Sequence, residues 1–134
     1  MNVQGKTWGR TAELFSRNNV ELHRIEVLRG GYCSKHKHAR KFNLFHVESG
    51  ALEITVWQPD GTADRTKIVA GQSCTVPPGA YHRFEAVTDA VALEVYWMEL
   101  DPGDIVRADP GGLSRPQSCI AAAGPVGPER RESS

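Results

Sequence analysis

The sequence of 134 residues lacks several features that mark particular classes of protein. It has no run of 18 apolar residues, and its first residues lack the apolar run of a signal peptide, so we expect neither a membrane-spanning helix nor a leader. Lys and Arg number 16 and Asp and Glu also number 16, so no broad basic field for nucleic acid is present. The expected partners therefore include no membrane and no nucleic acid.

Cysteine is also scarce. Only Cys33, Cys74 and Cys119 occur, far apart and without a C-x-x-C pair. An odd, sparse set indicates reduced thiols rather than a disulfide framework, which predicts a cytoplasmic protein. No base paired with a thiol is visible, so Cys33 and Cys74 are expected to be buried and unreactive.

The length suits one domain with a single modest core. We expect an N-terminal extension over residues 1–19, a β-barrel over residues 20–114 and a tail over residues 115–134. The tail is rich in Pro, Gly and Ala and cannot bury enough apolar surface to offset its chain entropy, which predicts a flexible segment. The one predicted helical piece is Arg10 to Phe15, in the extension.

The middle of the chain has the alternation of β-strands. Apolar residues recur at every second position in Val20 to Leu28, Ala51 to Trp57 and Val91 to Trp97. Turn signals such as Ser49-Gly50 separate these runs. Many short strands at such spacings predict an all-β sandwich or barrel.

Two of the five histidines form an H-x-H pair, His36 and His38. On an extended chain, residues two apart project from the same face, and two adjacent imidazoles suit a metal ion. The pair alone is a weak signal, but its surroundings strengthen it. Fixed positions in two runs match the patterns G-x5-H-x-H-x4-E-x6-G and G-x5-P-x-G-x2-H: Gly30, His36, His38, Gly50, Gly71, Pro77, Gly79 and His82.

These two patterns resemble the motifs of the cupin superfamily. The resemblance implies a double-stranded β-helix, a jelly-roll-like barrel, with His36, His38 and His82 as metal ligands. The glutamate of the first motif is replaced by Asn43, which can offer an amide oxygen but no charge. We expect one divalent transition metal per chain, Zn, Mn, Fe or Ni, and leave open whether Asn43 permits binding.

A closer resemblance extends over about residues 6–112. The chain looks like the type II mannose-6-phosphate isomerase domain, with Trp8-Gly9 near its start and Asp104-Ile105-Val106-Arg107 near its end. This likeness implies a sugar or sugar-phosphate isomerase or epimerase acting on a carbonyl. Such a reaction needs a base, and Asn43 cannot be one. The substrate-binding candidates are Arg40, Lys41, Glu94 and Tyr96, although alternation alone does not decide whether Glu94 or Leu93 faces the cavity.

Other histidines receive structural roles. His46 alternates with Asn43 and Phe45, so it is expected to point away from the cavity. His23 shares a face with Ile25 and Val27 and is expected to be a packed strand residue.

Three functions remain open at this stage. The first is the metal-dependent isomerase, and the second is a three-histidine Fe(II) dioxygenase of the thiol dioxygenase type. The third is a non-catalytic module that binds a small carbohydrate or anion. In each case we expect a small-molecule ligand, anionic or sugar-like, and a homodimer that covers exposed edge strands.

Overall fold

The computed structural model describes residues 2–99 and 103–114. These residues form nine strands and no helix, and all strand pairs are antiparallel. The strands are β1 (Asn2–Lys6), β2 (Gly9–Arg17), β3 (Val20–Val27), β4 (Phe42–Ser49), β5 (Ala51–Trp57), β6 (Ala63–Val69), β7 (Ser73–Val76), β8 (Tyr81–Ala86) and β9 (Ala90–Trp97). The predicted all-β fold is confirmed.

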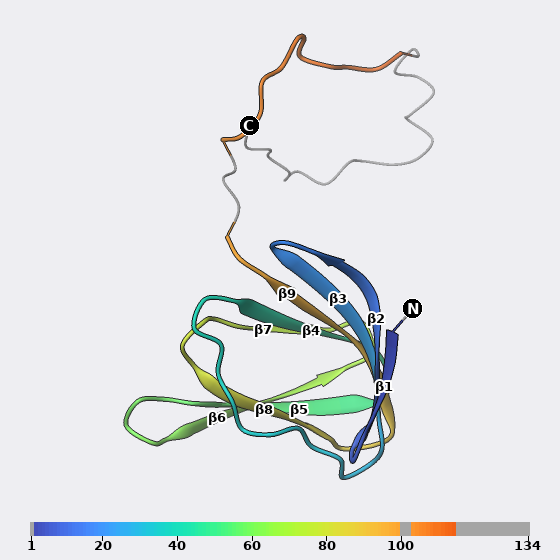
Figure 1. Ribbon diagram of the computed structural model, residues 1–134, viewed down its shortest axis with the longest axis vertical. Helices are drawn as coiled ribbons and strands as arrows, with labels where there is room; N and C mark the ends of the chain where they lie inside the picture. Colours follow the sequence, from blue (N-terminus) through green and yellow to red (C-terminus); the bar gives the residue numbers. More distant parts are fainter. Residues whose placement is uncertain (1, 100–102, 115–134) are drawn as a thin grey trace. The chain divides into compact units, whose positions relative to one another are not determined.

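The strands make two sheets that face each other across the core (Figure 1). The larger sheet has six strands in the order β1-β2-β3-β9-β4-β7, and the smaller has three in the order β6-β5-β8. The chain crosses from one sheet to the other between β4 and β5, between β6 and β7, and on either side of β8. This repeated crossing is the arrangement expected of a jelly-roll-like barrel.

Apolar side chains from both sheets fill the space between them. The six-stranded sheet contributes Ile25, Phe45 and Val47, and the three-stranded sheet contributes Ile54 and Phe84, each no more than 2% exposed. These positions follow the period of two that predicted the strands, since alternate residues of a strand point to the same face. The core therefore fixes which face of each strand looks inward.

The residues predicted to be helical, Arg10 to Phe15, lie in β2 instead. β2 pairs with β1 on one side and with β3 on the other, for example Thr11 with Ile25. A helix this short is marginal in water, and pairing with two strands outweighs its weak propensity. The helix prediction was wrong, and the N-terminal extension supplies two strands to the six-stranded sheet.

One motif glycine is required by the connection between β4 and β5. Gly50 has a φ of +79°, and a Cβ atom there would lie 2.1 Å from the carbonyl oxygen of Asp89. Any side chain would clash with that backbone, so only glycine fits. The motif residue thus serves the crossing between the sheets.

The chain divides into two units, residues 1–99 and residues 100–134. The described part of the second unit, residues 103–114, contains no strand and has a turn in which Gly111 N donates to Asp109 Oδ1 at 2.9 Å. The predicted barrel boundary at residue 114 lies in that segment, and the predicted tail over residues 115–134 lies outside the described residues. Nowhere in the described ranges is there a helix long and apolar enough to cross a membrane.

Candidate metal centre

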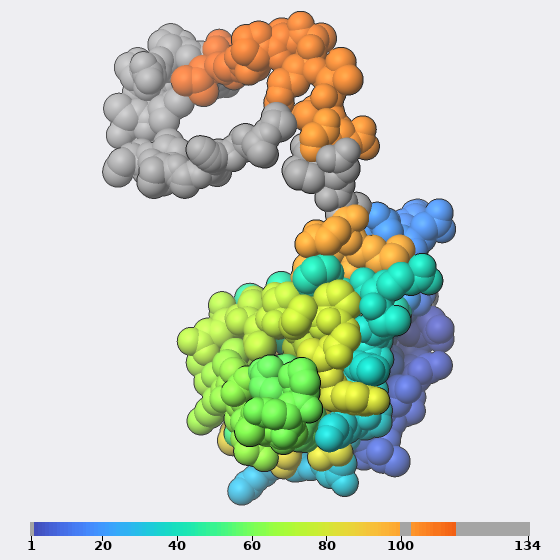
Figure 2. Space-filling model, turned by 90° about the vertical axis from the view of Figure 1, so that its left-hand side faces the viewer, coloured from blue at the N-terminus to red at the C-terminus, as the bar shows by residue number. Residues whose placement is uncertain are grey.

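The two predicted histidine motifs lie side by side. His36 N donates to the carbonyl oxygen of His82 at 3.1 Å, and His82 N donates to that of His36 at 2.8 Å. In Figure 2 the cyan segment that contains His36 borders the yellow segment around residue 80. This backbone bridge brings the first motif against β8, the strand that carries His82.

His38 is fixed by a glycine of the second motif. Gly79 N donates to the carbonyl oxygen of His38 at 2.8 Å. Gly79 has a φ of +84°, in the left-handed region that favours glycine. The turn at Gly79 therefore holds His38 and leads the chain into β8.

The three imidazoles form a compact triangle. Their ring centroids are 4.6 Å apart for His36 and His82, 5.0 Å for His36 and His38, and 5.4 Å for His38 and His82. One donor nitrogen from each ring lies within 4.8 Å of the other two. Three converging imidazoles can hold one ion and leave positions open for another ligand.

Backbone carbonyls orient two of these rings. His36 Nδ1 donates to the carbonyl oxygen of Ser34 at 2.7 Å, and His82 Nδ1 donates to that of Ala80 at 2.9 Å. A carbonyl only accepts, so Nδ1 carries the proton and Nε2 keeps its lone pair. His38 Nε2 is buried and has no hydrogen-bond partner. These are the tautomers and the orphan nitrogen expected of rings that bind a metal.

Asn43 lies at the same place. Its side chain is fully buried, and its Oδ1 is 3.2 Å from His82 Nε2. Because His82 Nδ1 holds the proton of the neutral ring, two acceptors then face each other. A cation between them would relieve this contact, so the geometry suits Asn43 as a fourth oxygen donor.

Burial favours the neutral forms of His38 and His82. Burial, followed by the neighbouring His36 and His82, lowers the pKa of His38 to about 4. Burial is also the main cause that lowers the pKa of His82. Neutral imidazole is the form that binds metals, so these residues fit a divalent transition metal.

An inner cavity of about 340 Å³ opens beside the histidines, lined by His36, His38, Glu94 and Tyr96 among others. Glu94 is 7% exposed, and the Tyr96 hydroxyl donates to its Oε2 at 2.7 Å. Burial raises the pKa of the Glu94 carboxyl, while the Tyr96 hydrogen bond opposes this rise. The structure thus answers the question that alternation left open, because Glu94 and Tyr96 face the cavity.

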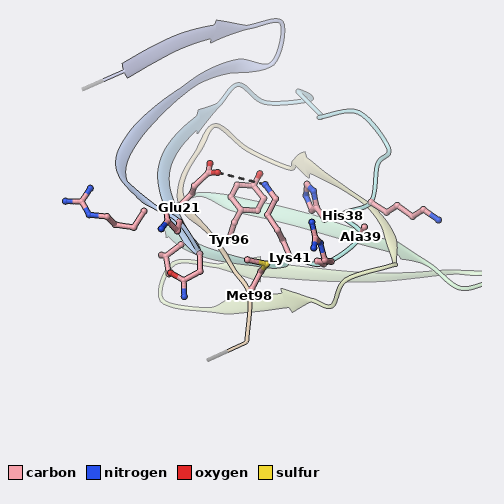
Figure 3. A pocket seen from close by; sticks show the side chains of 12 residues that line it. Glu21, His38, Ala39, Lys41, Tyr96 and Met98 are labelled. Atoms are coloured by element: carbon pink, nitrogen blue, oxygen red, sulfur yellow. Dashed lines mark ion pairs between the residues drawn. The ribbon is translucent and has the colours of Figure 1, made fainter. Parts of the chain in front are cut away.

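An outer pocket of about 440 Å³ adjoins the histidines as well (Figure 3). It is lined by Arg40 and Lys41, both predicted to bind substrate, together with His38 and Tyr96. The Lys41 ammonium lies 4.9 Å from the centroid of the Tyr96 ring. Arg40 and Lys41, the basic residues predicted to bind substrate, therefore line the same pocket as His38 and Tyr96.

Other basic residues near the first motif lie over aromatic rings. Lys35 Nζ is 4.2 Å from the centroid of the Trp57 ring, and Lys37 Nζ is 4.8 Å from that of Tyr81. Lys37 also lines the outer pocket, whereas Lys35 lines neither this pocket nor the inner cavity.

Sequence reasoning missed the contribution of β3 to the site. His23 lines the inner cavity, with its ring 5.8 Å from that of Tyr96, and its Nε2 is 3.1 Å from Glu21 Oε1. Glu21 also approaches Lys41, with 4.0 Å between Oε2 and Nζ. The shared parity of His23 with buried Ile25 was the available signal, since it placed His23 on the inner face.

The predictions for His46 and Cys33 agree with the structure, whereas Cys74, predicted to be buried, is only half-buried. His46 lies on the face opposite to Phe45 and is hydrogen-bonded to Ser73 Oγ at 2.7 Å. Cys33 is buried, and burial raises the pKa of its thiol to about 11. Burial also raises the pKa of Cys74.

Comparison with known families gives one match. The model of the Cupin domain family matches residues 23–99, more than half of the chain. No significantly similar protein was found among curated sequences.

Several solved structures share the fold at low sequence identity. KdgF from Halomonas sp. gives a TM-score of 0.64 at 16% identity, covering 75% of this chain and 89% of its own. An RmlC-like cupin from Shewanella frigidimarina gives 0.61 at 20% identity, covering 75% and 86%. Oxalate decarboxylase from Bacillus subtilis, which has Mn(II) centres, gives 0.65 at 18% identity, covering 91% of this chain and 34% of its own.

The structural likeness supports the fold, and the family match takes in every residue of the histidine cluster. The two crossing sheets and the two motif turns at Gly50 and Gly79 agree with it. The chain belongs to the cupin family.

Proposed function

We propose that this protein is a metal-dependent enzyme that moves a proton beside a carbonyl group of a small, anionic, sugar-like molecule, as an isomerase or epimerase does. The observation that carries this proposal is the shared inner cavity of His36, His38 and Glu94. Such reactions need a group that polarises the carbonyl and a base that moves the proton. Both can be supplied from the walls of this cavity.

His36, His38 and His82 would hold a divalent ion, with the amide oxygen of Asn43 as a fourth donor. When bound, the ion supplies a positive charge that polarises a carbonyl oxygen. The carbonyls of Ser34 and Ala80 already orient the rings of His36 and His82 for this role.

Glu94 is the proposed base. In an isomerase it would take the proton from the hydroxyl-bearing carbon next to the carbonyl and return it to the carbonyl carbon, while the hydroxyl proton passes to the carbonyl oxygen. In an epimerase the proton would return to the carbon that lost it, on its opposite face. Burial raises the pKa of this carboxyl, which makes it a stronger base than an exposed glutamate. The Tyr96 hydroxyl donates to Oε2 and so holds the carboxylate in place.

Arg40 and Lys41 would bind the anionic group of the substrate in the outer pocket. Arginine and lysine recognise phosphate and carboxylate groups through charge-assisted hydrogen bonds. The resemblance to type II mannose-6-phosphate isomerase supports a phosphate. The Mn(II) centres of oxalate decarboxylase, a structural neighbour, support manganese as one candidate ion.

The first experiment measures metal content by elemental analysis of the parent, His36→Ala and His82→Ala proteins. We expect one metal per chain in the parent and loss in both variants. The second incubates candidate sugar phosphates with the enzyme in D2O and follows deuterium incorporation by NMR. Glu94→Gln should retain metal and lose exchange, whereas Glu85→Gln, an exposed carboxylate on β8, should retain both. A parent that holds no metal after reconstitution would refute the proposal.

A second candidate is a three-histidine Fe(II) dioxygenase, because the metal-ligating group of His36, His38 and His82 contains no carboxylate. Oxygen uptake by the iron-loaded protein with a thiol substrate would favour it over the isomerase. Binding of a sugar phosphate without exchange or oxygen uptake would instead indicate a binding module.

We further propose a cytoplasmic homodimer. Both described cysteines are free thiols, as in reduced proteins. On the outer face of the six-stranded sheet, Leu22 and Leu44 flank Val95 in register, beside the stacked rings of Phe42 and Trp97. A second copy could cover this apolar face. Light scattering after size-exclusion chromatography should give twice the chain mass, and Val95→Lys should halve it.

A further inference from the structure

The outer pocket and the inner cavity share four side chains: Glu21, His38, Lys41 and Tyr96. His38 and Tyr96 are tied to the barrel, the first through its backbone to Gly79 and the second through its hydroxyl to Glu94. Glu21 and Lys41 are long charged side chains, 36% and 44% exposed. The boundary between the two spaces therefore includes an ion pair that can separate.

Lys41 is held only loosely. Its Nζ is 4.0 Å from Glu21 Oε2 and 4.9 Å from the centroid of the Tyr96 ring. Figure 3 shows Lys41 extending between Tyr96 and His38, with its ammonium end turned toward Glu21. A partly exposed ion pair contributes little stability, so an anion that enters the pocket can compete for the ammonium group.

Glu21 would keep a partner if Lys41 moved. His23 Nε2 lies 3.1 Å from Glu21 Oε1. The carboxylate of Glu13 lies within 4.8 Å of the ligand atoms of both Glu21 and His23. Because Glu21 is anchored and sits in a negative environment, Lys41 is the member of the pair that would move toward an incoming anion.

The charges that line the outer pocket favour such an anion. Arg17, Lys37 and Arg40 line it together with Lys41. Glu21 is the sole carboxylate among its described lining residues, and it forms an ion pair with Lys41. An incoming oxyanion therefore meets three cations and must take the fourth from Glu21.

We infer that Glu21 and Lys41 select the ligand by competition. A ligand with a phosphate or carboxylate at one end takes Lys41 from Glu21 and so joins the outer pocket to the inner cavity. Its other end then reaches the three histidines. A neutral molecule of the same shape cannot separate the pair and binds more weakly. This inference rests on the proposed function only for the carbonyl at the far end of the ligand.

The test measures equilibrium binding by calorimetry in the presence of Mn²⁺. The probes are mannose 6-phosphate and galacturonate, with mannose and galactose as their neutral counterparts. Lys41→Gln should weaken binding of the preferred anionic probe by about tenfold or more, because a charge-assisted contact is lost. Glu21→Gln should strengthen it by roughly two- to fivefold, because the competing ion pair is gone. Lys67→Gln, which removes an exposed charge on β6, should leave the binding of both anionic probes unchanged.

The double variant, Glu21→Gln with Lys41→Gln, tests whether Glu21 acts through Lys41. The gain from Glu21→Gln should largely vanish in the Lys41→Gln background. The inference is overturned if that gain persists, if Glu21→Gln weakens binding, if the neutral sugars respond equally, or if neither anionic probe binds. The two anionic probes distinguish phosphate from carboxylate. Opposite effects of the two single variants without proton exchange would support the selector and refute the isomerase.

Discussion

Replacing Asn43 by Asp would put a carboxyl where the first motif has lost one, with almost no change of shape. Asn43 is fully buried, its Oδ1 is 3.2 Å from His82 Nε2, and its side chain lies beside that of Glu94. Without a metal, burial and the neighbouring carboxyl would both raise the pKa of the new group. With a metal, the new carboxylate would become a charged ligand.

The expected cost without metal follows from linkage. A fully buried carboxyl has a pKa raised by about 3 to 5 units, and each unit corresponds to about 1.36 kcal/mol. A pH of 7 lies about 3 units above the ordinary pKa of an aspartate carboxyl. Asn43→Asp should therefore lower the free energy of unfolding by about 4 kcal/mol at this pH. The cost should shrink as the pH falls toward ~4, because the carboxyl is then protonated in the unfolded chain too. For a domain of this size, the melting temperature should fall by roughly 16–30 °C at pH 7.

Metal should remove most of this cost. If attraction to the dication limits the loss to about 1 kcal/mol, the remaining ~3 kcal/mol appears as tighter metal binding, roughly 100-fold. Urea unfolding followed by circular dichroism, in EDTA and in saturating Mn²⁺, measures both losses. Asn43→Leu is the matched control, since it removes the amide without adding charge and should show no rescue by metal.

One result would refute the reasoning. If Asn43→Asp loses the same stability with and without Mn²⁺, no cation binds beside Asn43. The 3.2 Å contact with His82 Nε2 would then be an ordinary buried hydrogen bond. Asn43 would have to be removed from the candidate ligands.

Three further outcomes test the rest of the structure. Cys33, whose buried thiol has a pKa raised to about 11, should resist iodoacetamide at pH 8 until the protein unfolds; rapid alkylation, read by mass spectrometry, would contradict this. In EDTA, the melting temperature should fall as the pH drops from 6.5 toward 4, because the lowered pKa of His38 means that the unfolded chain protonates first, and His38→Gln should flatten this slope. Phe45→Ala, at a position 1% exposed, should cost about 3–5 kcal/mol in urea unfolding. Phe15→Ala, at a position 45% exposed, should cost less than about 1 kcal/mol. Equal losses of stability in the Phe45→Ala and Phe15→Ala variants would show that Phe45 does not lie in the core.

The alternation of apolar residues predicted the strands but not the orientation of β9. Ala90 and Ala92, rather than the larger Val91 and Leu93, face the core at 4% and 0% exposure. β9 lies between β3 and β4, and on its outer face Val95 is flanked by Leu22 and Leu44, while Leu93 is flanked by Arg24 and His46. A strand that is apolar on one face and has small residues and Glu94 on the other can be oriented only once its register is known.

The histidine site was predictable because motif spacing encodes backbone geometry. The spacing around Gly79 places His38 and His82 on adjoining segments, whatever the intervening residues are. Glu21 carried no such signal. It precedes the first motif and reaches the site only because β3 pairs with β9, which sets Glu21 opposite Tyr96. Contacts made by sheet register, unlike those made by a turn, cannot be read from one sequence.

The candidate metal centre and the outer pocket both favour a negatively charged ligand. Three neutral imidazoles and the amide of Asn43 add no negative charge, so a bound dication would keep its full charge toward an open ligand position. Glu94 lines the same cavity, but as the proposed base it is directed at the substrate's proton and is not among the ligands of the ion. The lining of the outer pocket adds four cationic side chains, against which Glu21 is the one carboxylate described. An anionic ligand is thus favoured at both ends of the site, and the Glu21–Lys41 pair is where that preference can be adjusted by a single substitution.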